Sequence, residues 1–435
     1  MSRIDPNDAV QRAVLYTLPL YEMTRMRAAT SPRRHAEHGF AGEGAGSTMR
    51  WINQFTHTRR LLGPRDREVV TPNNDTLYTN AWLDLSGGPL LIDVPDMGER
   101  YWTLGFLDLW TNPFAYAGRR TTGNRAQRVF VHGPQWQGVA PAGAHVIAAP
   151  GDDVWIIGRI LVDPDDADLA TVRALQDRFA ITRADGSAAL GRIDALLDGR
   201  KTDTPEPALY ARAVGVALQR NPPPAGEAAE LANALQAGAA AAGGHAPGPA
   251  RLEPLGAALA AVCAELRDAP ADSQLGGGWN LPVLVRTGYG SDHRTRARVA
   301  RNLIGALGID EAMYPLAEVD AQGEPLDGRH RYVLRFPPGG APQVDAFWSL
   351  TIYRRADCLL VDNAIDRYSI GDRTPGLRTE PDGSLVVHIQ ADAPPEGANW
   401  LPAPPEPFYL TLRLYQPRAT HLDLRYEYPP VERSV

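Results

Sequence analysis

The feature that most constrains the fold of this chain is the alternation of apolar and polar residues in two separate blocks. In the first block, from about residue 67 to 162, short runs are separated by Pro and Gly turns: TLYTNAWLDL, PLLIDV, YWTLGFLDLW, RVFVHG, AHVIAAP and VWIIGRILV. The pattern returns from about residue 316 in RYVLRF, FWSLTIY, CLLVDN, LVVHIQ and FYLTLRLY. Alternation with a period of two is typical of half-buried strands. Many short strands of this kind predict β-sandwiches or barrels.

Between the two blocks the composition becomes helical and Ala-rich, starting at Asp163-Pro-Asp-Asp, where Asp165 or Asp166 is expected to cap a helix. A chain of 435 residues is long enough for two or three domains. We therefore predict a mainly β chain with a helical middle segment. The expected parts are an N-terminal helix and loop (1–66), a first β domain (67–162), a helical, Ala-rich middle region (163–312) and a second β-sandwich domain (313–435).

Charge and cysteine content limit the possible partners. The chain has 44 basic and 51 acidic residues, a net charge of -7, and no basic block, so neither nucleic acid nor an anionic membrane is an expected partner. Cys263 and Cys358 are its two cysteines and lie far apart, which excludes a disulfide framework. No apolar run reaches roughly 18 residues and the N-terminus lacks a signal-peptide pattern, so we expect a cytoplasmic protein with a small-molecule ligand.

Missing residue types and motifs exclude several kinds of chemistry. Lys201 is the only lysine. Schiff-base, pyridoxal phosphate and P-loop mechanisms all need a lysine amine, so they are excluded unless Lys201 lies in a site. The sequence also lacks G-x-S-x-G, H-E-x-x-H and C-x-x-C. We therefore expect no metal and no other cofactor.

The stretch VTPNNDTLYTN places four hydrogen-bonding side chains, Asn73 to Thr76, directly before a strand. One interpretation is a structural turn, in which Asn73 or Asn74 adopts the left-handed region and Asp75 accepts backbone N–H groups. The other is a binding site. The strand that follows has Leu77, Thr79, Ala81, Leu83 and Leu85 on one face and Tyr78, Asn80, Trp82 and Asp84 on the other. The second face suits a ligand pocket or a half-exposed outer surface.

Two further strands carry charged residues among apolar ones. Asp108 is predicted to share a face with Trp102, Leu104, Phe106 and Trp110. There it is either paired with an arginine or desolvated, with a pKa raised toward values that suit acid–base catalysis. In FYLTLRLY, Phe408, Leu410, Leu412 and Leu414 are expected to face a core, and Tyr409, Thr411, Arg413 and Tyr415 to face away. An arginine between tyrosines can clamp a carboxylate, or can stack on an exposed sheet.

The quoted segments resemble a known pair of domains. PNNDTLYTNAWLDL and GPLLIDVPDMGERYWTLGFLDLWTNPFAYAGRRTTG resemble the N-terminal domain of unknown function 1254. YVLRF, VDAFWSLTIY, DNAIDRYSIGDRTPGL, NWLPAPPEPFYLTLRLY and PPVER resemble its usual C-terminal companion, the domain of unknown function 1214. The resemblance implies two jelly-roll-like β-sandwich domains joined by an α-helical region, and frequent oligomers. It implies no settled reaction.

The family pattern runs through residues of both domains, more than a turn requires. They are Asn73, Asn74, Asp75, Thr76, Tyr78, Asp84, Arg100, Tyr101, Arg119, Trp348, Tyr353, Asn363, Arg367, Tyr368, Asn399, Trp400 and Arg413.

From these residues we predict an acid–base hydrolase or lyase that acts on a carbonyl- or carboxylate-bearing small molecule without a redox cofactor. Arg413, Arg367 or Arg119 would bind the anionic group, while Asn73, Asn74 and Tyr353 would stabilise oxyanion charge. Asp75 or Asp108 would be the general base or acid, with Tyr78 or Tyr368 as proton partner. Arg100, Trp348, Asn363, Asn399 and Trp400 complete the expected substrate site. The alternative is a non-catalytic β-sandwich that binds a small molecule or a carbohydrate.

Overall fold

The computed structural model describes residues 5, 8–33, 47–67, 69–224, 226–227, 229, 249–267 and 273–434. Within these ranges the chain is mainly β with a few helices, as the alternation predicts. None of the described helices is both long enough and apolar enough to cross a membrane.

The first β domain contains two sheets that share one core. The five-stranded sheet has the order β2-β3-β9-β5-β6, and the four-stranded sheet has the order β10-β4-β7-β8. Their bounds are β2 Thr56–His57, β3 Thr76–Asp84, β9 Asp153–Leu161, β5 Trp102–Asp108, β6 Pro113–Gly118, β10 Ala180–Arg183, β4 Leu90–Val94, β7 Gln127–His132 and β8 His145–Ala148. Leu83, Phe106 and Val131 belong to the shared core, which α2 (Asp166–Gln176) also contacts through Val172. Asp165 caps α2, one of the two predicted caps.

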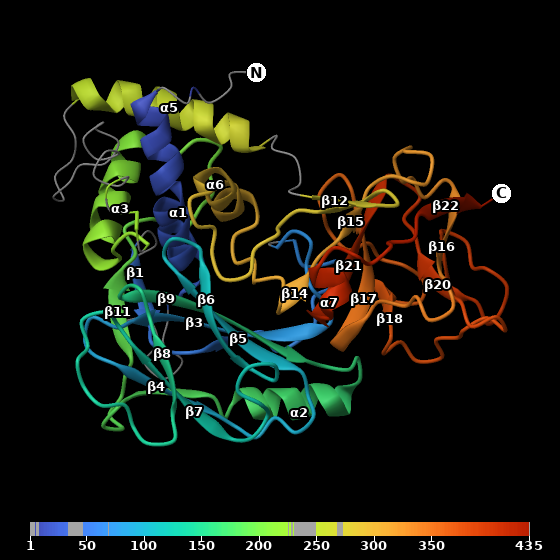
Figure 1. Cartoon of the computed structure of the whole chain (residues 1–435), viewed down its shortest axis with the longest axis horizontal. Coiled ribbons are helices and arrows are strands. Elements are labelled where there is room, and N and C mark those ends of the chain that lie inside the picture. The colour runs from blue at the N-terminus through green and yellow to red at the C-terminus, as the bar shows by residue number, and fades with distance from the viewer. Residues whose placement is uncertain are drawn as a thin grey trace.

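Helices cover the other face of the five-stranded sheet (Figure 1). They are α1 Ala9–Thr30, α3 Pro207–Arg220, α5 Pro249–Arg267 and α6 His293–Asn302. The stacked rings of Trp82 and Trp155, with centroids 5.2 Å apart, face this helical layer from β3 and β9. Because side chains alternate along a strand, β3 buries Leu83 in one core and Trp82 in the other.

The second β domain again has two sheets around one core. The larger has the order β12-β13-β15-β21-β17-β18, with β14 also paired to β21, and the smaller has the order β20-β19-β16-β22. Their bounds are β12 Ser273–Gly276, β13 Trp279–Leu281, β14 Ala312–Met313, β15 Leu316–Ala317, β16 Arg331–Phe336, β17 Val344–Arg354, β18 Ser369–Gly371, β19 Leu385–Gln390, β20 Asn399–Pro402, β21 Phe408–Pro417 and β22 Val431–Ser434; α7 spans Ala419–Leu422. Phe336, Leu350 and Leu412 lie in the common core.

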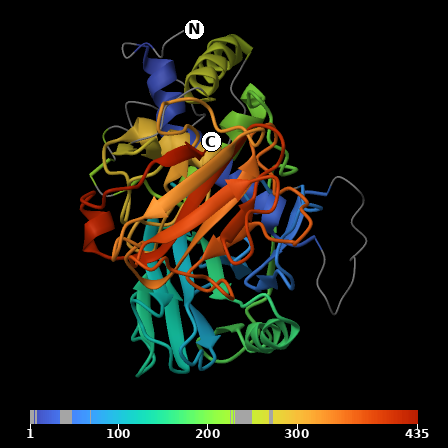
Figure 2. The same cartoon turned by 90° about the vertical axis from the view of Figure 1, so that its right-hand side faces the viewer.

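The predicted middle region contributes to both β domains as well as to the helical layer. Strand β10 joins β4, β11 (Gly191–Asp194) pairs with β1 (Met49–Ile52), and β12 and β13 extend the large sheet of the second domain. The jelly-roll topology stays a prediction. Figure 2 shows the second domain in front of the other parts, and Figure 1 shows β3 and β5 leading toward β14 and β21.

Candidate functional site: an arginine–tyrosine cluster between the domains

One face of the β17–β21 pair is polar and aromatic, and it lies against the first domain. The register aligns Phe347 with Tyr415, Ser349 with Arg413, and Tyr353 with Tyr409. The opposite face carries Phe408, Leu410, Leu412 and Leu414 and belongs to the second-domain core, as predicted. The first domain buries the polar face, so this face is not the solvent-exposed sheet surface that the sequence left as an alternative.

The Asn-Asn-Asp corner forms part of this contact. Asn73 Oδ1 accepts the backbone N–H of Asp75 at 2.7 Å and of Thr76 at 3.2 Å, which is an Asx turn. The accepting side chain is therefore Asn73, where we had expected Asp75. Asn73 Nδ2 also donates across the interface to Tyr415 Oη at 2.7 Å. The corner thus serves as a turn and as a domain contact.

The left-handed residue of this corner is Thr71, with φ of 49°, and neither Asn73 nor Asn74 has a positive φ. The prediction for the two asparagines was wrong. A β-branched residue in this region costs about 1–3 kcal/mol and persists only where its surroundings hold it. The second domain holds Thr71: its N–H donates to Cys358 O at 2.7 Å and its carbonyl accepts from Arg413 Nη2 at 2.9 Å.

Asp75 is buried and has a partner on each carboxylate oxygen. Ser349 Oγ donates to Oδ2 at 2.6 Å, and Arg373 Nη2 lies 3.2 Å from Oδ1. Arg373 also contacts Asp163, 2.9 Å from its Nη1. Asp75 therefore contributes to the ion-pair network that joins the domains.

Two buried arginines, one from each domain, meet at Tyr314, which lies between β14 and β15. Arg159 on β9 donates through Nη1 to Tyr314 Oη, and its guanidinium carbon lies 5.6 Å from the Tyr78 ring centre. Arg413 on β21 donates through Nη2 to Tyr353 Oη at 2.6 Å. The guanidinium carbons of Arg159 and Arg413 lie 5.7 and 5.4 Å from the Tyr314 ring centre.

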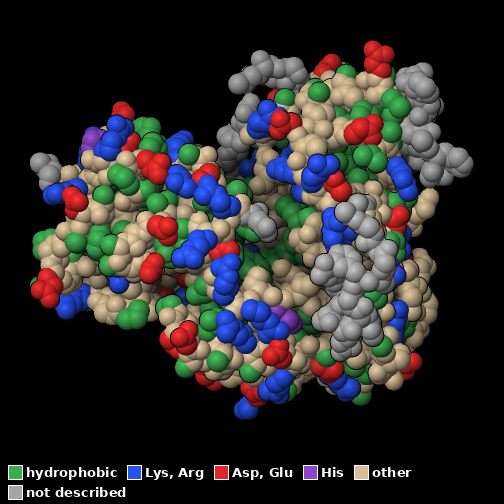
Figure 3. All heavy atoms as spheres, turned by 180° about the vertical axis from the view of Figure 1, so that it is seen from behind, with side chains coloured by type: hydrophobic (Ala, Val, Ile, Leu, Met, Phe, Trp, Pro, Cys, Tyr) green, Lys and Arg blue, Asp and Glu red, His purple; other side chains and the backbone are tan. Residues whose placement is uncertain are grey.

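Tyr101 and Tyr415 complete this group. Their ring centroids are 5.3 Å apart, and both hydroxyls lie close enough to Arg159 and Tyr314 to interact with them electrostatically. We name the set the arginine–tyrosine cluster; it consists of Arg159, Arg413, Tyr78, Tyr101, Tyr314, Tyr353 and Tyr415. In Figure 3 the surface is hollowed where the second domain meets the rest of the chain, with Lys and Arg side chains on part of the rim.

The two arginines lack an anionic partner. Arg159 is 7% and Arg413 is 5% exposed, and no carboxylate in the described ranges lies within ion-pair distance of either. The Nε atoms of both are buried without a hydrogen-bond acceptor, and so is Thr411 Oγ1 on the polar face of β21. Burying an uncompensated charge is costly, so this arrangement suits a ligand that brings negative charge.

Two tyrosines of the cluster, Tyr101 and Tyr415, hold their hydroxyl protons strongly. Burial, followed by the neighbouring Glu311, raises the pKa of Tyr101 well above its usual value, and its hydroxyl donates to Glu311 Oε1 at 2.9 Å. Burial, followed by Tyr314, does the same to the pKa of Tyr415. The hydroxyls of Tyr314 and Tyr415 accept from Arg159 and Asn73, and no described residue accepts their protons.

Asp108 lies at the far end of the same sheet. Thr76 pairs with Leu161 and Trp102 with Ile160 at one end of β9. Asp108 pairs with Val154 at the other end of β9. It accepts the N–H groups of Trp110 and Asn112 at 2.9 and 2.8 Å and Asn112 Nδ2 at 3.0 Å. Burial, partly offset by these bonds, raises the pKa of Asp108 to about 6.

Asp108 and Asp75 therefore do not share a site. Strand β5 ends at Asp108, so the alternation does not extend to Trp110, which packs in the core of the helical layer. Trp110 was wrongly assigned to the Trp102 face.

Several other predicted residues are engaged outside the cluster. Arg100 Nη1 donates to Asp168 at 2.8 Å within the first domain. Arg119 Nη1 donates to the carbonyl of Asp345 at 2.9 Å on an exposed edge between the domains. Trp348 points into the second-domain core, on the opposite face of β17 from Tyr353.

The remaining predicted residues organise loops of the second domain. Asn363 Oδ1 accepts the N–H of Arg367 at 3.0 Å, and Arg367 Nη1 donates to the carbonyl of Trp400 at 3.0 Å. Asn399 Nδ2 donates to two backbone carbonyls, each at 2.8 Å. Tyr368 packs beside Tyr353, but its hydroxyl donates to a carboxylate of its own loop at 3.0 Å.

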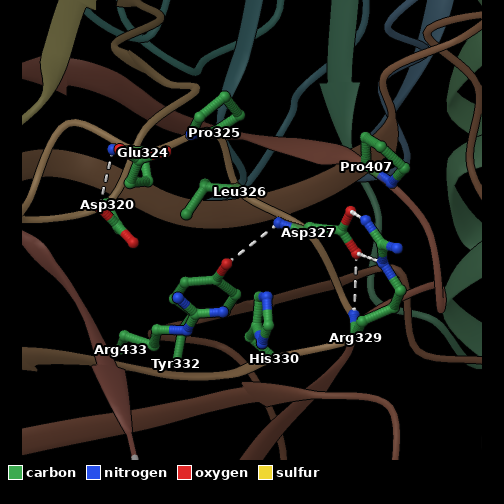
Figure 4. A pocket seen from close by; sticks show the side chains of 10 residues that line it. All are labelled: Asp320, Glu324, Pro325, Leu326, Asp327, Arg329, His330, Tyr332, Pro407 and Arg433. Atoms are coloured by element: carbon green, nitrogen blue, oxygen red, sulfur yellow. Dashed lines mark hydrogen bonds and ion pairs between the residues drawn. The ribbon is translucent and has the colours of Figure 1, made fainter.

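A cavity of about 340 Å³ lies elsewhere in the second domain (Figure 4). Its polar lining groups are largely satisfied by one another. Arg329 donates to both oxygens of Asp327 at 2.9 and 2.7 Å, and Asp320 Oδ1 accepts two backbone N–H groups. No predicted site residue lines it. We therefore place the candidate site at the cluster, where buried charge is uncompensated.

Sequence reasoning missed Arg159 and Tyr314. Arg159 interrupts the apolar run VWIIGRILV, and a single arginine in a buried strand is a signal that could have identified it. Tyr314 lies between two short strands and has no comparable signal. Among the described residues, no group of three or more His, Cys, Asp or Glu side chains could hold a metal ion.

Two family models match separate segments of the chain. Residues 52–183 match the family described as protein of unknown function (DUF1254), and residues 311–419 match the protein of unknown function (DUF1214). The chain therefore belongs to the proteins that combine these two domains. No curated protein matches it.

Two solved structures are similar to the chain. The VPA0106 protein from Vibrio parahaemolyticus is 24% identical, with 98% of this chain and 99% of that chain covered and a TM-score of 0.74, so the fold is shared. An uncharacterized protein from Burkholderia cenocepacia is 12% identical, with 95% and 85% covered and a TM-score of 0.41.

Proposed function

We propose that the chain binds a small carboxylate-bearing organic molecule at the arginine–tyrosine cluster and acts on it as an acid–base hydrolase or lyase. The observation that carries this proposal is the pair of buried arginines, Arg159 and Arg413, which come from different domains and have no carboxylate of the described part of the chain within ion-pair distance. Charge-assisted hydrogen bonds from guanidinium groups are the usual way to bind a carboxylate in a dry site.

Proton transfer in this proposal uses tyrosine and Asp75. The free protons of Tyr314 and Tyr415 make these residues the candidate acids. Asp75 is the predicted carboxylate that lies at the same interface, so it is the candidate base. Tyr353 is a weaker donor than we expected, because its hydroxyl already donates to Pro72 O at 2.7 Å.

A second candidate is a binding protein without catalysis. The observation that favours it is the full occupation of both predicted acids: Asp75 by Ser349 and Arg373, and Asp108 by its own turn. A carboxylate whose oxygens are already held by protein groups has no free oxygen to take a proton from a ligand.

The test separates affinity from turnover. Carboxylate-bearing compounds are screened by thermal shift, and each hit is then incubated with the protein and followed by NMR. Asp75→Asn should abolish turnover and keep affinity if Asp75 is the base. Asp163→Asn is the matched control, because it removes the other carboxylate on Arg373 but lies outside the cluster. Hits without turnover in wild type would favour the binding protein, and no hits at all would refute both.

A further inference from the structure

We propose that the ligand of the arginine–tyrosine cluster is an oxo acid, a molecule with both a carboxylate and a ketone or aldehyde oxygen, and that each arginine recognises one of these groups. The inference rests on the proposed function, since it assumes that the cluster binds a carboxylate. It goes further by giving Arg159 and Arg413 different roles.

Arg159 keeps the side of its guanidinium group that matches a carboxylate. Its Nη1 donates to Tyr314 Oη, its Nε is buried without an acceptor, and no described residue accepts from its Nη2. The N–H groups of Nε and Nη2 point in parallel and can donate to the two oxygens of one carboxylate. Arg159 is therefore assigned to the carboxylate.

Arg413 cannot donate two parallel N–H groups to one carboxylate in this structure. Its Nη2 donates to Thr71 O at 2.9 Å and to Tyr353 Oη at 2.6 Å, so both of its N–H groups are used. Both bidentate arrangements of a guanidinium group need Nη2, so only single hydrogen bonds remain: one from the buried Nε–H, and those from Nη1, for which no described residue is an acceptor. Thr411 Oγ1, also buried and without a partner, lies on the same face of β21 two residues away. A single carbonyl oxygen matches these donors.

The separation of the two arginines suits a short molecule. Their guanidinium carbons lie 5.7 and 5.4 Å from the Tyr314 ring centre, so they are at most about 11 Å apart. A hydrogen bond from each arginine covers part of this distance, so the ligand itself can be shorter. Guanidinium groups lie over the rings of Tyr78 and Tyr314, but both tyrosines are only partly buried, so the uncovered parts of their rings can contact the carbon chain between the two groups.

The experiment uses two pairs of acids that differ only by a ketone oxygen: propionate with pyruvate, and pentanoate with levulinate. Calorimetric titration of the full chain should show tighter binding of the oxo acid in at least one pair, by roughly tenfold, the value of one charged hydrogen bond. Arg159→Lys keeps the charge but not the parallel N–H groups. It should weaken the affinity for every acid that binds to wild type by roughly tenfold or more.

Arg413→Gln should remove the preference for the oxo acid and leave the binding of the simple acid within about threefold. Because this change also frees the Thr71 carbonyl, Thr411→Val is the second variant; it should reduce the same preference without touching that contact. Arg335→Gln is the matched control on an exposed strand position where Arg335 bonds to Ser384, and it should change nothing.

The outcomes separate the two proposals. Equal binding of simple and oxo acids, or equal losses for both acids in Arg159→Lys and Arg413→Gln, would overturn the oxo-acid assignment while keeping the carboxylate site. If none of the acids binds to wild type, the proposed function itself fails.

Discussion

Buried arginines occur in two regions of this molecule, and their partners differ. In the helical layer, Arg27 meets Asp153 at 2.7 Å and Arg296 meets Glu227 at 2.8 Å, while Arg301 pairs with Glu22. Between the β domains, Arg159 and Arg413 meet tyrosines and carbonyls instead. The first set can be explained by folding alone. The second set leaves its charge without a carboxylate among the described residues, as a binding site can. An unused donor does not by itself separate the two sets, because the Nε atoms of Arg27 and Arg296 are also buried without an acceptor.

Arg50 is an instructive intermediate case. It is also buried without a carboxylate in ion-pair distance among the described residues, but it donates to the carbonyls of Ala28, Ser47 and Met49 at 2.7–2.9 Å. Three carbonyl acceptors satisfy most of its donors. Lack of a carboxylate is therefore not sufficient to define a site. The stronger criterion is two buried arginines at one place that have neither a carboxylate nor acceptors for all their donors.

The largest effect should come from breaking a pair in the helical layer. Arg27→Met leaves Asp153 buried with one cation fewer, and we expect the free energy of unfolding to fall by about 3 kcal/mol in urea denaturation. Arg335→Met on an exposed strand is the control and should stay near wild type. A loss for Arg27→Met no larger than that of the control would remove the distinction between the two regions.

The next effect concerns Asp108 and pH. Its folded pKa of about 6 lies above its ordinary value of 3.8, so the protonated carboxyl favours the folded state. The protonated Asp108 therefore contributes about 3 kcal/mol to the free energy of unfolding. This contribution is fully present below about pH 4 and is lost as the pH rises through about 6. The difference in unfolding free energy between wild type and Asp108→Asn should therefore change across this range. A constant difference would contradict the shifted pKa, and weaker binding of carboxylates by Asp108→Asn would contradict its place outside the cluster.

The smallest effect is expected at Arg119. Its hydrogen bond to the Asp345 carbonyl lies at an exposed edge, so Arg119→Ala should change the free energy of unfolding by less than about 0.5 kcal/mol. The binding of carboxylates should also stay unchanged in thermal-shift titrations. A clear loss of binding would extend the anion site to this edge and restore the role that the sequence predicted for Arg119.

Local patterns in the sequence predicted more of the fold than of the site. Alternation within a strand assigns faces correctly, as for Leu412 in the core and Arg413 on the polar face, because it depends only on neighbouring residues. Strand register and domain docking depend on distant residues. The sequence could therefore not show that Asp75 and Asp108 lie at opposite ends of one sheet, or that Arg159 approaches Tyr314.

The corner before β3 shows the same limit on a smaller scale. Asparagine is the usual residue for a left-handed position, so Asn73 and Asn74 were reasonable predictions. The second domain instead holds Thr71 in that conformation through Cys358 and Arg413. Contacts of this kind override local preference and cannot be read from a single stretch of sequence.

The central claim is that the buried charge between the domains is kept for a ligand and not for stability. The most direct test is the urea unfolding of wild type and Arg159→Met, each with and without millimolar levulinate. We predict that Arg159→Met is as stable as wild type or more stable without the acid, because it removes an uncompensated charge, and that the acid stabilises wild type alone. A variant that is several kcal/mol less stable than wild type without the acid, or that is stabilised by the acid as much as wild type, would contradict the claim.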